Sequence, residues 1–537
     1  MTKSRDLGNL AQSVAVNLPA SLGSASQTLA VNSGASALEF VDAATGGGGG
    51  SLQAVASGSL SDGSTVIINS DGTVSAVAGS SSFTIGSQVQ WETSTQNAHT
   101  AIAYDQGADK IVVTYKDVNN SNYLQVVVGS VSGTSISFGT PLVYFSGAST
   151  SKNKPRILYH PGNQKVFIFG GIYTNAQSRL WMLTVSGTSI TLDSTTSPFS
   201  GANMWEYGFD MCYDAASGNL VLLANPSWME LQVVTVSGSS LSLGSRITFP
   251  GTQSFSTDYA VIESDGNGGI FLVYNNYSNT RVYSATLSGS SLTFHSNIMP
   301  QNQFNYKFTG MPSLIYLPSV SRFLLVGPRP SAIEAFLYSV STSGSVGFTN
   351  TAGPTTFSTG TYSSYQGNNV DAVYYTPISN PYIAYSHNPS STLKLNKLTC
   401  TATAITFGTE VDVGTSSANT SLFFPYMAYD PDTQSIVLVA HDDFGTGAQA
   451  AFAHVINPQT QSTNLTANNF LGISDGVYSN GQTATIQTIG SVDDAQSGLV
   501  PPNKYYVQYD GSLSTTAGNP SVEAGMAVAS TKIIVKG

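Results

Sequence analysis

The sequence predicts an all-β protein: a seven-bladed β-propeller inserted in a small split β-barrel, preceded by an extended N-terminal attachment segment. Three observations predict this fold class. The polar phrase VSGTSISFG at Val131 returns through the middle of the chain at spacings of 54, 51, 51, 54 and 59 residues. A second element, AYDQGADKIVVTY from Ala103, recurs seven times in step with it. Only 9% of residues are charged, against about 25% in a typical soluble domain, which favours short strands joined by tight polar turns.

Each repeat contains four short β patterns in about 50 residues, the period of a propeller blade. In the first repeat one apolar strand ends at the Tyr-Asp turn, and a strongly apolar strand follows at 111–115. An alternating strand is expected at 124–131 and a more polar one at 136–145. This gradient predicts inner strands buried between blades and an outer strand that faces water.

The ends of the ring are predicted by a displaced phrase. FTIGSQVQWE, from Phe83, resembles the fourth-strand phrase but precedes the first Tyr-Asp turn, and no copy follows the third strand of the seventh repeat. We therefore expect 83–91 to complete the last blade, so that the propeller spans 83–464.

The flanking segments form the rest of the predicted architecture. Residues 1–50 contain a polar lead and the run GGGGG, typical of a flexible joint. Segments 51–82 and 465–537 share short β patterns with Asp-Gly turns. Thirty residues cannot bury a core alone, so we expect these two segments to form one barrel around the inserted propeller.

Composition excludes several classes of function. The net charge of −11 argues against nucleic-acid binding. No apolar run approaches the length of a membrane span, and the N-terminus lacks the apolar region of a secretory signal. Cys212 and Cys400 fall in different repeats and predict no disulfide framework. No phosphate-binding loop, metal-ligand spacing or nucleophile elbow is present, so no cofactor and no metal are expected.

One face of the predicted propeller carries longer and more varied connections than the other. These connections are rich in aromatic residues and Asn, and flat aromatic rings flanked by amide donors suit sugar recognition. The alternative is that the aromatics pack between blades or at a protein interface. The candidate binding residues are Trp205, Tyr207, Trp228, Tyr277, Tyr306, Tyr365, Asn122 and Asn276.

Enzymatic interpretations find less support in the sequence. The turn ESDGNGG at Glu263 has the wrong order for a sialidase motif, and the arginines are dispersed. A glycosidase needs two facing carboxyl groups, which the sequence alone cannot pair. A cation site at His441 and its two following aspartates lacks a third ligand at a suitable spacing. We therefore expect no enzyme. The carboxylates expected on the varied face are Glu206, Asp210, Asp258, Asp371, Asp442 and Asp443.

Several phrases resemble fibre and appendage proteins of marine tailed phages, especially cyanophages. They are SRDLGNLA, LGSASQTLAVNSGASALEF and the Gly run at the start, the VSGTSISFG repeats, and QSGLVPPNKYYVQYDGSLSTT with AGMAVASTKIIVKG at the end. The split domain is similar to phage capsid-decoration modules. The resemblance implies no cofactor and no catalytic residue.

This resemblance implies a phage virion structural protein, made in the host cytoplasm without a signal peptide and displayed on the virion surface. Its expected role is that of a tail-fibre-like appendage that attaches to a host receptor, a surface glycan. Expected partners are other virion proteins and further copies of the chain, as a trimer. The alternatives are a capsid-decorating or purely structural appendage, and a polysaccharide depolymerase.

Overall fold

The computed structural model describes most of the chain. The chain divides into two compact units: the smaller consists of Met1–Ser82 together with Gln459–Gly537, and the larger consists of Phe83–Pro458. Both units are built from antiparallel β-sheets. Among the described residues, no helix is long and apolar enough to cross a membrane. The described residues are 27–31, 38–42, 50–91, 97–147, 155–172, 177–199, 208–226, 229–248, 259–276, 279–295, 308–340, 348–359, 370–387, 392–415, 423–442, 451–518 and 520–536.

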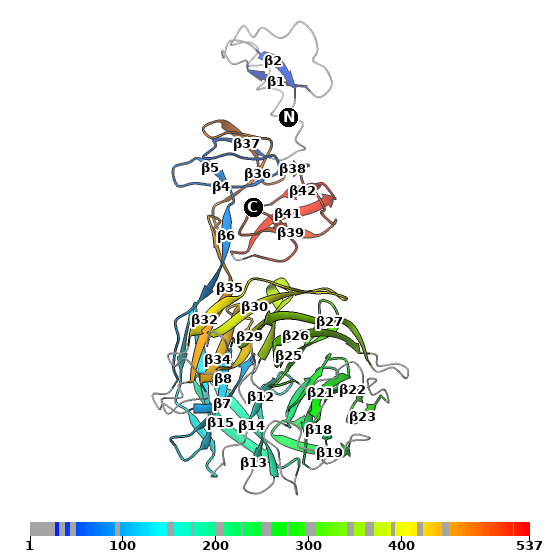
Figure 1. Cartoon of the computed structure of the whole chain (residues 1–537). Helices are drawn as coiled ribbons and strands as arrows, with labels where there is room; N and C mark the ends of the chain where they lie inside the picture. The colour runs from blue at the N-terminus through cyan, green and yellow to red at the C-terminus, as the bar shows by residue number, and fades with distance from the viewer. Residues whose placement is uncertain are drawn as a thin grey trace. The chain divides into compact units, whose positions relative to one another are not determined.

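The larger unit consists of sheets that follow one another along the chain, each with its strands mostly in sequence order (Figure 1). The first three contain β7 (Asn97–Asp105), β8 (Lys110–Asp117), β9 (Tyr123–Ser132), β10 (Ser135–Phe138) and β11 (Leu142–Phe145); β12 (Arg156–His160), β13 (Lys165–Ile172), β14 (Gln177–Ser186) and β15 (Ser189–Thr196); and β16 (Asp210–Asp214), β17 (Asn219–Ala224), β18 (Glu230–Ser237) and β19 (Ser240–Thr248). The next three contain β20 (Ala260–Ser264), β21 (Gly269–Asn276), β22 (Asn279–Ser288) and β23 (Ser291–Phe294); β24 (Ser313–Leu317), β25 (Arg322–Arg329), β26 (Ala332–Val340) and β27 (Phe348–Thr359); and β28 (Val370–Tyr375), the short 3-10 helix η2 (Thr376–Ile378), β29 (Asn380–His387), β30 (Thr392–Cys400), β31 (Ile405–Phe407) and β32 (Val411–Thr415). The last contains β33 (Phe423–Asp430), β34 (Ser435–Asp442), β35 (Ala451–Thr463) and β6 (Gly79–Ile85).

The first strands of these sheets meet in cyclic order. Each contacts the first strand of the next sheet, from β7 to β12 and onward to β33, and β33 contacts β7 again. The apolar clusters lie between neighbouring sheets, and all six residues of β17 are buried. The sheets therefore form a closed, propeller-like ring whose cores are the spaces between adjacent sheets.

The recurring Tyr-Asp turn has a structural cause. The side chain of Asp105 accepts hydrogen bonds from the backbone N–H groups of Gly107 and Ala108 at 2.9 and 3.0 Å. Asp430 accepts from the two corresponding residues of its own turn at 3.0 and 3.2 Å. Each aspartate thus holds the turn between the first and second strands of its sheet, as short acidic side chains commonly do.

The VSGTS phrase forms the connection between third and fourth strands. Its two central residues join β9 to β10, and the same two-residue connection joins β14 to β15, β18 to β19 and β22 to β23. The first central residue is Gly in all four copies, with φ between 58° and 60°. Glycine adopts this left-handed conformation without steric cost, which explains why the phrase is repeated.

The outer strands show one departure from the sequence prediction and one displaced partner. The strand expected over 136–145 is two strands, β10 and β11, because Pro141 between them has no N–H to donate to β9. β6 is the fourth strand beside β35 (Figure 1), but it spans Gly79–Ile85 rather than the expected 83–91, and an isolated bridge from Val89 to Ala453 follows it. A Cβ added at Gly86 would lie 1.8 Å from the Thr134 carbonyl oxygen, and one at Gly139 would lie 2.3 Å from that of Thr188. The two glycines therefore occupy equivalent places against the turn of the next sheet.

The smaller unit contains two five-stranded sheets and a hairpin. One sheet has the order β3-β37-β36-β4-β5 and is joined across its ends by a parallel bridge between Ala56 and Val74. The other has the order β38-β42-β41-β39-β40, and one apolar cluster draws residues from both sheets. The strands are β1 (Gln27–Val31), β2 (Leu38–Asp42), β3 (Ser51–Val55), β4 (Thr65–Ile68), β5 (Val74–Ala76), β36 (Phe470–Ser474), β37 (Thr483–Gln487), β38 (Val492–Asp493), β39 (Lys504–Val507), β40 (Leu513–Ser514), β41 (Val522–Ala529) and β42 (Lys532–Val535).

Candidate functional site

A polar cavity of about 260 Å³ lies where the first strands of the ring meet. Every one of the seven sheets contributes residues to its wall, and most of these stand on, or directly before, the first strand. The position four residues before the end of each first strand contributes in six sheets. In chain order these lining residues are Ala101, Arg156, Asp210, Ser313, Asp371 and Tyr426. The repeated backbone thus presents different side chains to one central space.

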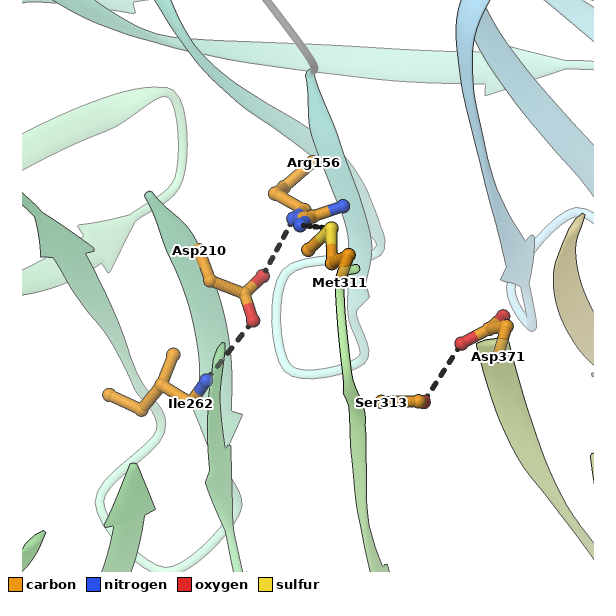
Figure 2. A network of polar contacts seen from close by, with 6 residues as sticks. All are labelled: Arg156, Asp210, Ile262, Met311, Ser313 and Asp371. Carbon is orange, nitrogen blue, oxygen red and sulfur yellow. Dashed lines mark hydrogen bonds and ion pairs between the residues drawn. The ribbon is translucent and has the colours of Figure 1, made fainter. Parts of the chain in front are cut away.

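Arg156 and Asp210 form an ion pair in the wall of this cavity. Nε of Arg156 lies 3.3 Å from Oδ1 of Asp210, and the two side chains expose 10% and 16% of their surface. Oδ2 of Asp210 accepts a hydrogen bond from the Ile262 backbone N–H at 3.1 Å. Arg156 also donates from Nη2 to the sulfur of Met311, which lies two residues before β24, and Figure 2 shows these groups converging from separate segments of the chain.

Asp371 forms a second polar group on the opposite part of the wall (Figure 2). Its Oδ1 accepts a hydrogen bond from the Ser313 hydroxyl at 2.9 Å, and its Oδ2 accepts from the Met427 backbone N–H at 2.7 Å. The Ser313 hydroxyl in turn accepts from the Ala372 N–H at 3.0 Å. Burial nevertheless raises the pKa of Asp371 to about 6, because these donors and Arg156 only partly offset the loss of hydration.

Glu263 and Tyr426 complete the titratable groups of the cavity. Glu263 accepts the Ser264 backbone N–H at 2.9 Å, and burial together with the nearby Asp210 charge raises its pKa to about 8. Burial also raises the pKa of Asp210, although the Arg156 charge opposes it. Tyr426, which accepts a hydrogen bond from Arg156, has its pKa raised by burial. At neutral pH the wall therefore holds a protonated Glu263 beside an ion-paired carboxylate.

This arrangement is rich in hydrogen-bond acceptors and contains one fixed cation. Carboxylate oxygens accept hydrogen bonds from ligand hydroxyl groups, and a guanidinium donates to ligand oxygen. Within the described residues, no group of three or more His, Cys, Asp or Glu side chains is placed to hold a metal ion. The wall therefore suits a small polar ligand bound through hydrogen bonds.

None of the six predicted aromatic binding residues falls within the part of the chain that the structure describes. Trp205, Tyr207, Trp228, Tyr277, Tyr306 and Tyr365 lie outside the described residues. Asn122 lies in the turn between β8 and β9, half-buried, with a φ of 59° that Asn tolerates better than most residues. Asn276 is the last residue of β21 and pairs with Asn279 in the ladder to β22.

Two of the six predicted carboxylates line the cavity. Asp210 and Asp371 both line the cavity, although no sequence pattern pairs them. Asp442 is the last residue of β34, and Glu206, Asp258 and Asp443 lie outside the described residues. His441 is buried, stacks on Phe424 with 4.7 Å between ring centroids, and contacts the Thr100 hydroxyl at 3.0 Å. Its ring serves the packing of β7 against β34.

Arg156, Glu263 and Tyr426 were absent from the predicted set. A signal for two of them exists in the repeats. Arg156 and Tyr426 stand two residues before the start of the recurring element that begins at Leu158 and Ala428, in the same register as Asp210 and Asp371. The phrase ESDGNGG predicts a turn at Glu263, whereas Glu263 lies within β20. The two cysteines are free thiols, with Cys212 buried and Cys400 half-buried.

Comparison with known proteins relates the chain to solved structures only by fold. No protein-family model and no curated protein matches it. A protein of unknown function from Dyadobacter fermentans aligns at 12% identity and a TM-score of 0.40, covering 70% of this chain and 98% of its own. The Dos1 propeller aligns at 10% and 0.39, covering 75% and 95%. A NanB sialidase variant from Streptococcus pneumoniae aligns at 9% and 0.41, covering 70% and 71%.

Proposed function

We propose that the chain is a structural protein of a phage particle: a fibre-like surface appendage that attaches the particle to a glycan on the host cell. In this proposal the sheets of the larger unit are the blades of one seven-bladed propeller. The smaller unit is a split β-barrel in which the propeller is inserted, and residues 1–50 attach it to other virion proteins. The resemblance of its terminal phrases to phage appendages supports the virion location.

The observation that carries the binding role is the polar cavity at the centre of the ring. A propeller that serves only as a spacer needs no charged groups there, because burying charge costs free energy that apolar packing avoids. This chain nevertheless places Arg156 and three carboxyl groups around one space. Convergent polar groups with shifted pKa values in one cavity are typical of binding sites, and this favours attachment over a purely structural role.

Two experiments with the intact protein test this proposal. Immunogold labelling of intact particles should place the chain on the particle surface, at a fibre rather than over the head shell. Purified full-length chain should bind host cells and their isolated surface polysaccharide, and soluble polysaccharide should compete. Label over the head shell would support the capsid-decorating alternative, and label on no part of the particle would refute the virion role.

A depolymerase remains the second candidate because of one observation. Glu263, whose pKa is about 8, shares the cavity with Asp210 and Asp371, and glycoside hydrolysis uses a protonated carboxyl opposite an ionised one. If the chain hydrolyses host polysaccharide, new reducing ends should accumulate and Glu263→Gln should abolish their release. Unchanged polysaccharide after prolonged incubation would leave attachment as the function.

A further inference from the structure

The cavity wall contains hydrogen-bonding groups that the fold itself does not fully use. Arg156 is 8% exposed, and its Nε–H has no hydrogen-bond acceptor although Asp210 lies within ion-pair distance. Buried donors of this kind are normally satisfied by protein, water or ligand. The volume of about 260 Å³ exceeds the roughly 150 Å³ of a cavity that holds one benzene molecule, so the cavity has room for one compact ring-shaped molecule.

The charge of the wall limits which molecules it accepts. Asp210, Glu263 and Asp371 place three carboxyl groups around the space, and the one guanidinium on its wall is already paired with Asp210. A ligand that brings its own carboxylate would meet the carboxyl group of Asp371 and the ion-paired Asp210, with no free cation to balance its charge. A ligand with several hydroxyl groups would donate to the carboxyl oxygens and accept from Arg156.

Apolar surface is present between the polar groups. Val261, Met311 and Leu314, which belong to the apolar cluster between two neighbouring sheets, also contribute to the lining of the cavity. A sugar ring has the matching character, with hydroxyl groups at its edge and C–H groups on its faces. Small-molecule sites typically combine such an apolar lining with a few placed polar groups.

We infer that this cavity binds one non-acidic, hydroxyl-rich sugar residue, and that it discriminates against sugars that carry a carboxylate. The carboxyl groups of Asp371 and Glu263 accept hydrogen bonds from the sugar hydroxyls, and Arg156 donates to a sugar oxygen. The inference rests on the proposed attachment function and deepens it by naming the ligand class and its site.

The test compares sugars on the full-length chain by saturation-transfer NMR and calorimetry. The probes are the methyl glycosides of glucose, galactose and mannose, with glucuronate and N-acetylneuraminate as their acidic counterparts. At least one neutral glycoside should bind in the millimolar range, and the acidic sugars should bind at least tenfold more weakly. Binding of no neutral glycoside, or equal binding of an acidic one, would overturn the inference without any variant.

Two variants locate the binding in the cavity. Ala101→Leu adds volume to the wall and removes no polar group, so it should weaken neutral-sugar binding at least tenfold. Asp412→Asn, at a carboxylate whose side chain is 62% exposed, is the matched control and should leave binding unchanged. Unfolding curves establish that both variants are folded.

The same two variants separate this inference from the attachment function. If folded Ala101→Leu binds the sugar as wild type does, the site is not this cavity. If Ala101→Leu loses sugar binding but still adheres fully to host cells, the cavity binds the sugar but does not carry the attachment, and the link between this site and the attachment function is refuted. Sugar binding that depends on Ala101, in a chain found on no virion, would support the cavity and refute the virion role.

Discussion

The raised pKa of Glu263 predicts a measurable dependence of stability on pH. The folded protein keeps this carboxyl protonated up to a pH of about 8, whereas the unfolded chain ionises it near 4.5. Between these values the folded state binds more protons than the unfolded state, so the free energy of unfolding falls as the pH rises. The loss begins near pH 4.5 and is complete above about pH 8.

The size of the effect follows from the same interval. From 4.5 to about 8, at about 1.4 kcal/mol per pH unit, the upper limit is about 5 kcal/mol. The cavity leaves Glu263 only partly shielded from solvent, so we expect about half of that limit. Glu263→Gln mimics the protonated side chain and keeps an acceptor for the Ser264 N–H, and it therefore removes the effect without removing the hydrogen bond.

The assay is urea unfolding of wild type and Glu263→Gln at pH 5, 6.5 and 8.5. The two proteins should have similar stability at pH 5, and the variant should be more stable by about 2 kcal/mol or more at pH 8.5. The difference between the two proteins cancels contributions from other groups, including His160 and His454, whose pKa values are lowered by burial. A difference that does not change with pH would refute the assignment of a buried, protonated Glu263.

Three further predictions concern the ring itself. Gly86→Ala places a Cβ 1.8 Å from the Thr134 carbonyl oxygen and should destabilise the protein by about 3 kcal/mol, whereas Gly414→Ala, whose Cβ would meet nothing closer than 3.8 Å, should change the unfolding midpoint little. Asp214→Ala removes a side chain that accepts three hydrogen bonds and should cost about 3 kcal/mol in urea unfolding; an unchanged midpoint would contradict its role in the turn. Burial raises the pKa of the Cys400 thiol to about 12, so it should react slowly with a thiol reagent at pH 8 and rapidly once the chain is unfolded in urea.

The local parts of the fold were predictable because they depend on local chemistry. The turn glycine of VSGTS is required by a positive φ, and the aspartate of the Tyr-Asp turn is required by two nearby N–H groups. The displaced phrase at Phe83 indicated an outer strand, and β6 does pair with β35, although it begins at Gly79 and ends at Ile85 rather than covering 83–91. Each of these features is encoded within a few residues, so repetition in the sequence makes it visible.

The cavity was not predictable in the same way because it depends on how the sheets close. Asp210 and Asp371 are far apart in the sequence, and only the cyclic order of the first strands brings them to one space. Both aspartates occupy the same position of the aligned repeats as Arg156 and Tyr426. The residue type at this position differs from one repeat to the next. Variation at one register position looks like ordinary surface variation until the ring shows that this register faces inward.

Chain connectivity relates this cavity to the predicted aromatic residues. Arg156, Asp210 and Ser313 are the first residues of β12, β16 and β24, so each directly follows a connection between two sheets. Trp205 and Tyr207 precede Asp210 in one of these connections. Binding of a longer glycan, compared with that of one sugar residue, measures whether groups outside the cavity wall add to the affinity.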